Sequence, residues 1–590
     1  MKMQAVYNIA EICARHGITD VVLSPGSRSA PLTLAFARHP ALTVRVVPDE
    51  RAAAFIGLGI AQAQRRAVAL VCTSGTAGLN YAPAVAEAFF QHIPLVIFTA
   101  DRPPEWIDQL DGQTIRQHDL YGTHAKGSFE FPADTAHADA KWHSARIVNE
   151  AINLAQAAPA GPVQVNVPLR EPFYPKPGEE IRYEQDVKIT LEATPEPVLP
   201  TIEAAAFLSE IQAAKRVLVV AGQNPANSEL QATVGTFAAA VGATVVGDTI
   251  ANLLAPNSPA IGHQDVFLGG LTKEARAELR PDLLITYGQS LISKSLKLFL
   301  RDAAPAEHWH LQAHGEAADT FRALTRVIRV EPASFFHQLA GLQTGGGDTA
   351  AGSNPSRSSS SESSSPSDET TAWQHAEDSA ITFLNRFFAN DAAPFNEFAA
   401  FRHALAFLPG YTALHLANSM AVRYANILGI PQNRQIEVFA NRGTSGIDGC
   451  TSTAVGAALA QPQRPVVLLT GDVAFFYDRN AFWHNYPLPN LRVVLFNNHG
   501  GGIFRIIDGP RQQPELEEFF ETRQQLTAEN TARDFNLRYF PVSNFAELDA
   551  ALPVFFATET GAAILEVFTD SKTNAAFFEE YRAAVKTAFA

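Results

Sequence analysis

The sequence predicts an α/β protein built from three doubly wound parallel sheets. Short apolar strands alternate with stretches of helical spacing along most of the chain, and repeated βαβ units of this kind form parallel sheets. The chain has 590 residues, enough for three or four domains of about 150 residues each. Its composition, 46% hydrophobic and 18% charged, is that of a globular protein. Together these observations favour several α/β domains.

The first two domains follow from the strand pattern. We expect an N-terminal domain at residues 1–185 and a central one at 200–340. The loop after the first central strand, Gly222–Pro225, lacks the G-x-G-x-x-G sequence, so it carries no dinucleotide fingerprint. The expected strands are Val21–Leu23, Thr43–Val47, Ala67–Cys72 and Leu95–Thr99, then Val217–Ala221, Ala243–Val246, Leu283–Tyr287 and Val327–Val330; the expected helices are Arg51–Arg65 and Ala77–Phe90.

A Gly- and Ser-rich segment separates the central domain from the last one. Residues 345–371 hold the run SRSSSSESSSPS, which cannot bury enough apolar surface to offset its chain entropy, so we expect a disordered linker. A third α/β domain follows at 373–590 and closes with the strand Ala563–Phe568.

Bulk properties exclude several classes of protein. A net charge of −15 argues against a nucleic-acid partner, and no apolar run is long enough to span a membrane. The N-terminus lacks the core of a signal peptide. Cys13, Cys72 and Cys450 are few and scattered, which fits reduced thiols in the cytoplasm and no catalytic role.

Two strand ends in the last domain carry the chemistry. An apolar strand ends at Gly471 and Asp472, and a second, Val493–Phe496, ends at Asn497 and Asn498 before three glycines, 500–502. Ligands of open α/β sheets bind at the carboxyl ends of strands. A carboxylate and an amide oxygen suit Mg²⁺, and glycines allow close approach of a diphosphate. The alternative is an ordinary βαβ unit with a polar turn.

This spacing resembles the thiamine-diphosphate motif, which begins Gly-Asp and ends Asn-Asn. The resemblance implies that Asp472, the Asn498 side chain and the Gly500 carbonyl hold Mg²⁺ or Mn²⁺. Glu50, which follows a strand and opens an Ala-rich helix, would contact the aminopyrimidine of the cofactor; the alternative is that it only favours the helix N-terminus. The remaining cofactor contacts implied are Thr76, Ser445, Ile447, Gly471, Val473, Gly501 and Ile503, with Val473 standing where Gly is usual.

Eight ordered motifs narrow the resemblance to one family. The chain is similar to 2-succinyl-5-enolpyruvyl-6-hydroxy-3-cyclohexene-1-carboxylate synthases of menaquinone biosynthesis, in the thiamine-diphosphate decarboxylase superfamily. The middle domain matches more weakly. The motifs are SPGSRSAPL (24–32), DERAAAF (49–55), TSGTAGLN (73–80), TADRPPE (99–105), GQTIRQ (112–117), ANSMAVR (417–423), NRGTSGIDG (441–449) and NNHGGGIF (497–504).

The resemblance implies a reaction and its substrates. The family decarboxylates 2-oxoglutarate and adds the four-carbon unit to isochorismate in a 1,4-addition. Both substrates are anionic, and arginine clamps carboxylates with two hydrogen bonds. By the resemblance, Arg423 and Arg442 would hold the succinyl carboxylate of the 2-oxoglutarate adduct. The residues implied for isochorismate and the substrate pocket are Ser27, Arg28, Gln113, Lys294, Ser419, Ile503 and Phe504, and those implied to be catalytic are Glu50, Arg28, Gln113, Arg423 and Arg442.

Each of these residues has a simpler explanation. Arg28 could support the Pro-Gly turn, Arg442 could pair with Asp448, and Ser419 could be a turn hydroxyl. Ile447 could be an ordinary core residue, and Lys294 part of a solvated helix face. Three positions depart from the family pattern and bear on substrate affinity: Gly112, Ser295 and His499.

The resemblance also implies a homo-oligomer, a dimer or tetramer with the active site between subunits. Two rival functions remain. Another thiamine-diphosphate decarboxylase or acetolactate-synthase-type enzyme would not need the cations Arg28, Arg423 and Arg442. A non-catalytic thiamine-diphosphate sensor would be expected to lose Glu50 or the metal ligands, and the sequence retains both.

Overall fold

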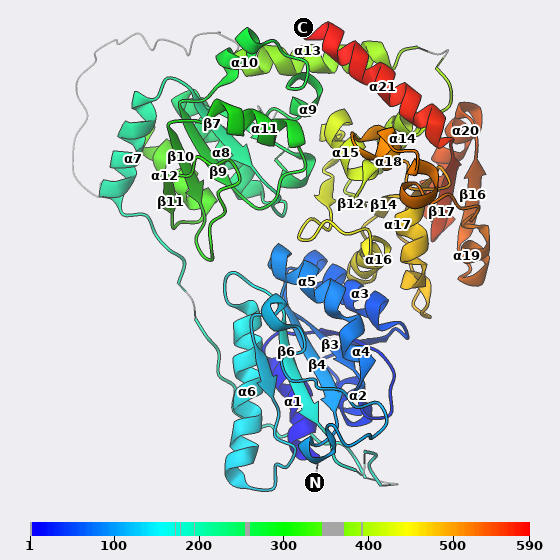
Figure 1. The fold of residues 1–590 in the computed structure, drawn as a ribbon. Helices are drawn as coiled ribbons and strands as arrows, with labels where there is room; N and C mark the ends of the chain where they lie inside the picture. Colours follow the sequence, from blue (N-terminus) through cyan, green and yellow to red (C-terminus); the bar gives the residue numbers. More distant parts are fainter. Residues whose placement is uncertain are drawn as a thin grey trace. The chain divides into compact units, whose positions relative to one another are not determined.

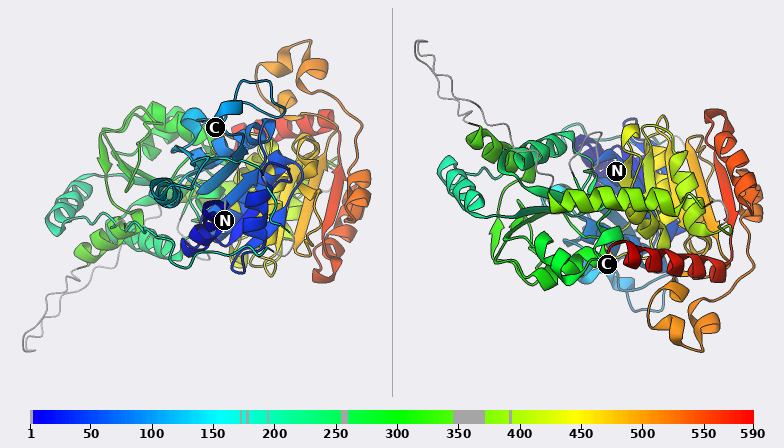
Figure 2. Two further views of the ribbon diagram at one scale, coloured as in Figure 1. Left: turned by 90° about the horizontal axis from the view of Figure 1, so that it is seen from below. Right: turned by 90° about the horizontal axis from the view of Figure 1, so that it is seen from above.

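The computed structural model describes residues 3–171, 173–176, 179–193, 195–253, 260–344, 371–390 and 393–590. The chain divides into two compact units. Unit 1 comprises Met1–Thr194, Pro394–Val422 and Arg434–Phe577, and unit 2 comprises Pro195–Ala393, Arg423–Asn433 and Phe578–Ala590. Three parallel sheets confirm the predicted fold class (Figure 1, Figure 2). The predicted linker at 345–371 lies almost wholly outside the described residues.

The first sheet of unit 1 has six parallel strands in the order β2-β1-β3-β4-β6-β5. One apolar cluster packs helices α1, α2 and α6 against it, and another packs α3 and α5, which makes it doubly wound. Its strands are β1 (Asp20–Leu23), β2 (Thr43–Val46), β3 (Val68–Cys72), β4 (Leu95–Asp101), β5 (Ser128–Glu130) and β6 (Val163–Pro168). Its helices are α1 (Gln4–Arg15), α2 (Ala30–Ala37), α3 (Glu50–Gln64), α4 (Thr76–Asn80), α5 (Ala82–Gln91) and α6 (Ala138–Gln156).

The single helix predicted at Ala77–Phe90 is two helices, α4 and α5, which break at Tyr81. Pro83 lies in the first turn of α5, where its missing N–H is tolerated, whereas inside a longer helix the same ring would remove a backbone hydrogen bond. The Tyr81 hydroxyl donates to the Val71 carbonyl at 2.9 Å and fixes the break against β3.

The second sheet of unit 1 repeats the topology of the first. Its order is β13-β12-β14-β15-β17-β16, which is the same permutation of strands. The strands are β12 (Ala413–Leu416), β13 (Glu437–Phe439), β14 (Val466–Gly471), β15 (Leu491–Asn497), β16 (Arg538–Val542) and β17 (Ala563–Phe568). The helices are α14 (Glu397–Ala406), α16 (Cys450–Ala460), α17 (Asp472–Tyr477), α18 (Ile503–Ile506), α19 (Glu529–Asp534) and α20 (Phe545–Phe555).

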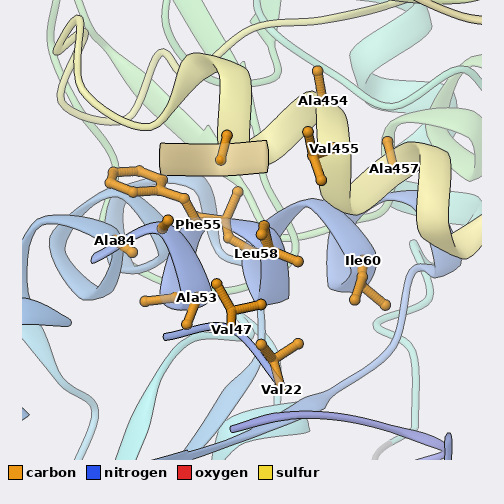
Figure 3. Close-up of a cluster of buried hydrophobic side chains, with 14 of the residues drawn as sticks. Val22, Val47, Ala53, Phe55, Leu58, Ile60, Ala84, Ala454, Val455 and Ala457 are labelled. Atoms are coloured by element: carbon orange, nitrogen blue, oxygen red, sulfur yellow. The ribbon is translucent and has the colours of Figure 1, made fainter. Parts of the chain in front are cut away.

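Helices α3 and α16 join the two sheets of unit 1 through a shared apolar core (Figure 3). A Cβ at Gly59 would lie 2.0 Å from the Thr453 carbonyl oxygen, and one at Gly456 would lie 2.1 Å from the Ile56 carbonyl oxygen. Side chains at these two positions would therefore force the helices apart. The Ala- and Gly-rich composition of both helices is a packing requirement as well as a sequence motif.

The sheet of unit 2 has five parallel strands in the order β11-β10-β9-β7-β8. Its strands are β7 (Val217–Ala221), β8 (Thr244–Gly247), β9 (Leu283–Tyr287), β10 (Glu307–Leu311) and β11 (Arg326–Ile328). Its helices are α7 (Thr201–Ala213), α8 (Ser228–Val241), α9 (Gln264–Phe267), α10 (Lys273–Leu279), α11 (Lys294–Ala303), α12 (Pro332–Gln343) and α13 (Ala372–Phe387); α15 (Met420–Leu428) and α21 (Ser571–Ala588) span unit boundaries.

Strands β5, β6, β10, β12, β13 and β16 are absent from the sequence prediction. β6 and β10 carry polar residues at buried positions, which masks the apolar run. In β6, Gln164 donates to Thr99 Oγ1 at 3.1 Å and Asn166 donates to Asp101 at 2.9 Å. In β10, the His308 ring lies 2.9 Å from Thr286 Oγ1. Paired polar groups are tolerated in a core strand, and sequence alone does not reveal the partners.

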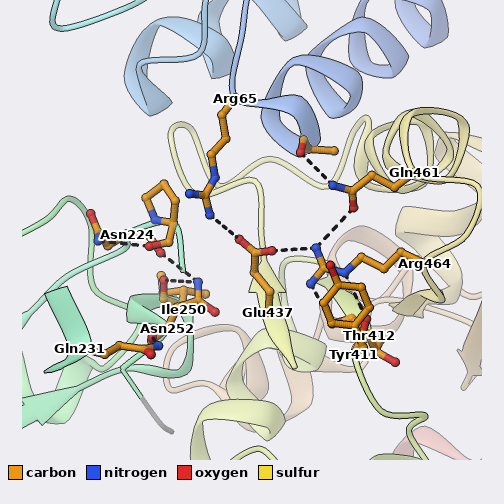
Figure 4. Close-up of polar contacts among 12 residues, drawn as sticks. Arg65, Asn224, Gln231, Ile250, Asn252, Tyr411, Thr412, Glu437, Gln461 and Arg464 are labelled. Atoms are coloured by element: carbon orange, nitrogen blue, oxygen red, sulfur yellow. Dashed lines mark hydrogen bonds and ion pairs between the residues drawn. The ribbon is translucent and has the colours of Figure 1, made fainter. Parts of the chain in front are cut away.

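Polar contacts fix strand ends in both units (Figure 4). In unit 1, Glu437 at the start of β13 forms an ion pair of 2.8 Å with the buried Arg464, and a second of 3.2 Å with the more exposed Arg65. In unit 2, Asn252 donates to the Asn224 carbonyl at 2.9 Å. The three cysteines are buried and unbridged. None of the described helices is both long and apolar enough to cross a membrane.

Candidate active site

The carboxyl ends of β14 and β15 lie side by side, with Gly471 paired to Phe496. Asp472 begins α17 directly after β14, and its side chain is only 2% exposed. Gln524 Nε2 donates to its carboxylate at 2.9 Å. Burial raises the pKa of Asp472 to about 6, although hydrogen bonds from Gln524 and from backbone N–H groups oppose that shift. The aspartate is thus a buried carboxylate held by Gln524 and local backbone N–H groups.

The two asparagines at the end of β15 have different surroundings. Asn497 is fully buried, and its Nδ2 donates to the Leu526 carbonyl at 2.9 Å and to Glu566 at 2.7 Å. Its Oδ1 accepts from the His499 backbone N–H at 3.0 Å. Asn498 Nδ2 donates to Glu397 at 2.8 Å, but its buried Oδ1 has no hydrogen-bond partner. Asn497 is therefore structural, and Asn498 presents an unused acceptor.

The glycine loop after Asn498 is constrained by its neighbours. A Cβ at Gly500 would lie 2.7 Å from the Glu521 carbonyl oxygen, and a Cβ at Gly502 would lie 2.9 Å from Asn498 Nδ2. The Gly501 N–H donates to the same Glu521 carbonyl at 2.7 Å. These glycines are needed for the loop to pack beside Asn498, a reason that the sequence analysis did not include.

These residues fit a hard divalent cation. An unpartnered amide oxygen inside a protein costs free energy, and Asn498 Oδ1 is such an atom beside the buried carboxylate of the neighbouring strand end. Mg²⁺ takes one or two carboxylates or other oxygens from protein and the rest from water and phosphate. Within the described residues, no three His, Cys, Asp or Glu side chains gather as a metal site, so any cation here relies on amide and carbonyl oxygens too.

Glu397 is a site neighbour that the sequence analysis missed. It is the first residue of α14, only 5% exposed, and far in sequence from Asn498. Burial raises the pKa of Glu397 to about 7; the hydrogen bond from Asn498 opposes the shift and the charge of Asp472 adds to it. The acidic start of a helix is an ordinary sequence pattern, so no local signal marked this residue.

The loop between β13 and α16 holds several predicted residues in place. Arg442 donates to Asn418 Oδ1 at 3.1 Å, and Asn418 Nδ2 donates to the Gly446 carbonyl at 2.7 Å. Ile447 packs against Ala417, Cys450 and Ala474. Ser445 in this loop has a φ of 63°, and Ser419, between β12 and α15, has a φ of 76°. This left-handed conformation is adopted by non-glycine residues at a cost and often occurs at functional sites.

A second residue missed from the sequence is Glu87, which lies in α5 and is 1% exposed. Its carboxylate accepts from the backbone N–H groups of Gly443 at 2.8 Å and Thr444 at 2.7 Å. This carboxylate therefore anchors the loop that carries Arg442 and Ser445. Helical spacing predicted the helix but could not reveal that one of its acids binds a distant loop.

Glu50 opens α3, as predicted, and is half-buried. The helix cap is the neighbouring Asp49, whose carboxylate accepts from the Arg51 N–H at 3.0 Å and the Ala52 N–H at 3.3 Å. The charge of Glu50 contributes to the raised pKa values of Cys72 and Tyr81, after burial. Because Asp49 supplies the capping oxygen, Glu50 is left available for another role.

Two arginines, Arg28 after β1 and Arg102 after β4, lie beyond the carboxyl ends of strands in the first sheet. Arg28 donates to the Leu169 carbonyl at 3.0 Å, and its guanidinium lies 4.6 Å from the centre of the Phe173 ring. Burial lowers the pKa of Arg28, and the charge of Arg102 lowers it further. Arg102, which sequence analysis passed over within TADRPPE, donates to Ser74 Oγ at 2.7 Å and to Asp111 at 2.7 Å. Two arginines thus lie near each other here.

The other residues predicted at the carboxyl ends of these strands, Ser27, Thr76 and Gln113, are exposed. Ser27 follows β1, and Thr76 begins α4. Gln113 has a φ of 55°, and its carbonyl oxygen would lie 3.3 Å from a Cβ at Gly75. The Gly112 carbonyl accepts from Arg102. The loop of Gln113 therefore lies beside the turn that carries Thr76.

Lys294 and Arg423 belong to unit 2. Lys294 is the exposed first residue of α11, after Ser293, whose hydroxyl caps that helix by accepting from the Leu296 N–H at 3.0 Å. Arg423 is an exposed residue of α15. In unit 1, Val473 is the second residue of the short helix α17, and Ile503 is the first residue of the short helix α18. The centre of the Phe504 ring lies 5.8 Å from that of Phe520.

Three models of thiamine pyrophosphate enzyme domains match the chain. The N-terminal thiamine pyrophosphate-binding domain matches residues 3–123, the middle domain 199–343, and the C-terminal thiamine pyrophosphate-binding domain 420–567. Among solved structures, benzoylformate decarboxylase from Polynucleobacter necessarius superposes with a TM-score of 0.68 at 18% identity, over 96% of this chain and 99% of that one. That likeness shows the same fold.

Curated relatives share a name as well as a fold. The chain is 43% identical to 2-succinyl-5-enolpyruvyl-6-hydroxy-3-cyclohexene-1-carboxylate synthase of Cytophaga hutchinsonii over 100% of both chains. It is 37% identical to the enzyme of that name from Flavobacterium johnsoniae over 98% of each chain, and 38% identical to that from Porphyromonas gingivalis over 96% of this chain and 94% of the relative. The chain therefore belongs to the 2-succinyl-5-enolpyruvyl-6-hydroxy-3-cyclohexene-1-carboxylate synthase family of thiamine pyrophosphate enzymes.

Proposed function

We propose that this protein joins 2-oxoglutarate and isochorismate in menaquinone biosynthesis. The products are CO₂ and 2-succinyl-5-enolpyruvyl-6-hydroxy-3-cyclohexene-1-carboxylate. One carboxylate of 2-oxoglutarate leaves as CO₂, and the remaining four-carbon unit adds 1,4 to isochorismate. The observation that carries the proposal is the buried Asp472 beside the unpartnered Asn498 Oδ1, at adjacent strand ends of a chain from this family.

The proposed cofactors are thiamine diphosphate and Mg²⁺ or Mn²⁺. Bound thiamine diphosphate supplies decarboxylation of a 2-oxo acid with retention of the electron pair on the former carbonyl carbon. Asp472, Asn498 Oδ1 and the Gly500 carbonyl would hold the cation, and Glu50 would hold a proton at the aminopyrimidine ring. Ile447 would pack against the cofactor. The residues proposed to line it are Thr76, Ser445, Gly471, Val473, Gly501 and Ile503.

Arginines and a lysine would bind the anionic substrates. Arg423 and Arg442 would clamp the distal carboxylate of 2-oxoglutarate, since guanidinium groups bind carboxylates with two hydrogen bonds. Arg28 would bind isochorismate, and its neighbour Arg102 strengthens the positive field at that edge. The other residues proposed for isochorismate and the pocket wall are Ser27, Gln113, Lys294, Ser419, Ile503 and Phe504.

Assembly, location and domain limits are part of the same proposal. We expect a cytoplasmic homodimer or homotetramer in which Glu50 of one subunit serves the cation site of another. The proposed domains are residues 1–185, 200–340 and 373–590. Light scattering on the purified protein measures the assembly, and a stable monomer with full activity contradicts it.

The direct test is a coupled measurement of both substrates. Purified protein with thiamine diphosphate, Mg²⁺ and 2-oxoglutarate should consume isochorismate, with release of CO₂ and a product heavier by a succinic-semialdehyde unit. Decarboxylation of 2-oxoglutarate without loss of isochorismate would instead assign the chain to a simple decarboxylase.

Two variants test the residue roles. Glu50→Gln should retain much of the cofactor binding and lose nearly all turnover, because an amide cannot exchange the proton; unchanged turnover would contradict the role of Glu50. Arg423→Ala should raise KM for 2-oxoglutarate. A rise in KM for isochorismate alone would show that the substrates are assigned to the wrong arginines.

A further inference from the structure

A buried glutamate lies directly against the proposed cation ligand Asn498. Glu397 Oε2 accepts from Asn498 Nδ2 at 2.8 Å. The glutamate is itself held by Asn574, whose Oδ1 accepts from the Glu397 backbone N–H at 2.8 Å and whose Nδ2 lies 3.3 Å from Glu397 Oε2. Asn574 Nδ2 also donates to Thr569 Oγ1 at 2.9 Å. The carboxylate therefore has a fixed position beside the amide.

The chemistry of a carboxamide gives this contact a direction. One end of the group only donates hydrogen bonds and the other only accepts. The ionised carboxylate of Glu397 only accepts, so the NH₂ end of Asn498 faces it, and the reversed amide would place two unprotonated oxygens against each other. The Oδ1 atom then points away from Glu397, where it is buried and unpartnered. A cation can be bound only by that oxygen.

We propose that Glu397 is a positioning residue that orients the Asn498 carboxamide so that its oxygen, and not its nitrogen, faces the divalent cation. The inference rests on the proposed function only in placing the cation at Asp472 and Asn498. It requires no assignment of substrates. Partners of this kind, one shell beyond a metal ligand, commonly fix ligand orientation, and their loss costs about 10- to 100-fold in metal affinity.

Two substitutions separate orientation from simple charge. Glu397→Met removes the acceptor at similar volume, so both amide orientations become available, and we expect Mg²⁺ or Mn²⁺ to bind about 10- to 100-fold more weakly. Glu397→Gln removes the charge, but its amide oxygen can take the place of Oε2, to which both Asn574 Nδ2 and Asn498 Nδ2 donate, so binding should fall by less than about threefold. The readout is Mn²⁺ binding by electron paramagnetic resonance, with thiamine diphosphate and without substrate.

A second-site change provides the rescue. The two oxygens of an aspartate are equivalent, so an aspartate at position 498 needs no orientation. Glu397→Met/Asn498→Asp carries the same total charge as the natural pair, and it should recover Mn²⁺ affinity to within about threefold of the natural protein. Asn498→Asp alone would place a second carboxylate against Glu397. Comparing its Mn²⁺ affinity with that of the double variant separates the effect of added charge from that of the restored ligand oxygen.

Glu377 offers a matched control. It is a buried glutamate of unit 2 that accepts from the Gly262 N–H at 3.1 Å and the His263 N–H at 3.0 Å. Glu377→Met should leave Mn²⁺ affinity unchanged, whatever it costs in stability. Equal losses in Glu397→Gln and Glu397→Met, or no rescue by Asn498→Asp, would overturn the orienting role. If Asp472→Ala leaves Mn²⁺ binding unchanged, the proposed cation site itself fails, which is a distinguishable result.

Discussion

Two acidic clusters of similar composition, one in each unit, have different structures. Each combines two carboxylates with one asparagine, and each contains a buried aspartate whose pKa burial raises to about 6. By residue type alone, either could be a cation site. The cluster of unit 1 comprises Asp472, Glu397 and Asn498, and that of unit 2 comprises Asp248, Asp265 and Asn426.

The difference lies in the two asparagines. Asn426 uses both ends of its carboxamide: Nδ2 donates to Asp265 at 2.8 Å and Asp248 at 3.2 Å, and Oδ1 accepts from the Thr249 N–H at 3.0 Å. Asn498 uses only its nitrogen, and its buried oxygen has no partner. A carboxamide that is paired at both ends is closed to ligands and stabilises the fold, whereas one with an unpaired oxygen leaves a position for a ligand.

The closed cluster still has a bearing on the proposed site. Asp248 accepts from the Ser293 N–H at 3.0 Å, next to Lys294, and it binds Asn426 on α15, the helix that also carries Arg423. Its hydrogen bonds therefore tie together the two segments of unit 2 that carry predicted substrate-binding cations. The comparison teaches that the count of acidic residues does not distinguish a site from a support; the central asparagine does, because Asn426 Oδ1 is paired and Asn498 Oδ1 is not.

The largest expected effect separates the two clusters by metal affinity. Asp472→Ala should weaken Mg²⁺ binding by at least about 100-fold, because the site loses the only anionic ligand proposed from the protein. Asp265→Ala, in the closed cluster, should leave Mg²⁺ affinity unchanged. Calorimetry with thiamine diphosphate measures both. Comparable losses of Mg²⁺ affinity in the two variants would contradict the distinction between the two clusters.

A change in the closed cluster should act on stability instead. Asn426→Leu removes one hydrogen-bond donor from each of two buried carboxylates and leaves the Thr249 N–H without its acceptor, which should cost unit 2 about 2–5 kcal/mol in free energy of unfolding. Tryptophan fluorescence in urea reports this unit, because Trp309 and Trp373 are buried there, while Trp106, Trp142 and Trp483 of unit 1 are more than half exposed. Altered Mg²⁺ affinity in a folded variant would contradict a purely supporting role.

The pH dependence of stability gives a third, smaller effect. Burial, and then the charge of Asp265, raise the pKa of Asp248 from 3.8 to about 6. The folded state therefore binds this proton more tightly than the unfolded state. The stabilisation of the folded state by this proton is complete below about pH 4 and is lost as the pH rises to about 6. The loss amounts to about 3 kcal/mol.

Asp248→Asn tests this titration. Urea unfolding of both proteins between pH 4 and pH 7, followed by tryptophan fluorescence, gives the difference in slope. The natural protein should lose stability relative to the variant as the pH rises from about 4 to about 6. Parallel curves for the two proteins would show that Asp248 does not titrate in this range.

The smallest expected effect concerns a second neighbour of the cation site. Gln524→Leu removes the hydrogen bond of 2.9 Å to Asp472, and it should weaken Mg²⁺ binding by about 3- to 10-fold, or about 1 kcal/mol. Gln264→Leu in unit 2 is the matched control, because Gln264 Nε2 donates to Asp248 at 2.8 Å. It should change stability and not metal affinity.

The sequence by itself predicted the features that are coded locally. Alternating strands and helices predicted three parallel sheets, and Asp472 and Asn498 were marked because each directly follows an apolar strand whose carboxyl end faces the same edge. Glu50 was marked in the same way at the start of α3. Chain direction in a parallel sheet is enough to place such residues.

Only the tertiary structure decided which polar groups meet across long stretches of sequence. Glu397 reaches Asn498, Glu87 holds the loop of Arg442, and Arg102 lies near Arg28, although no periodicity links these residues. The same holds for the strands masked by buried polar residues. A buried polar group is tolerated only if a partner satisfies it, and the fold determines that partner, because hydrogen bonding depends on distance in space and not on separation along the chain.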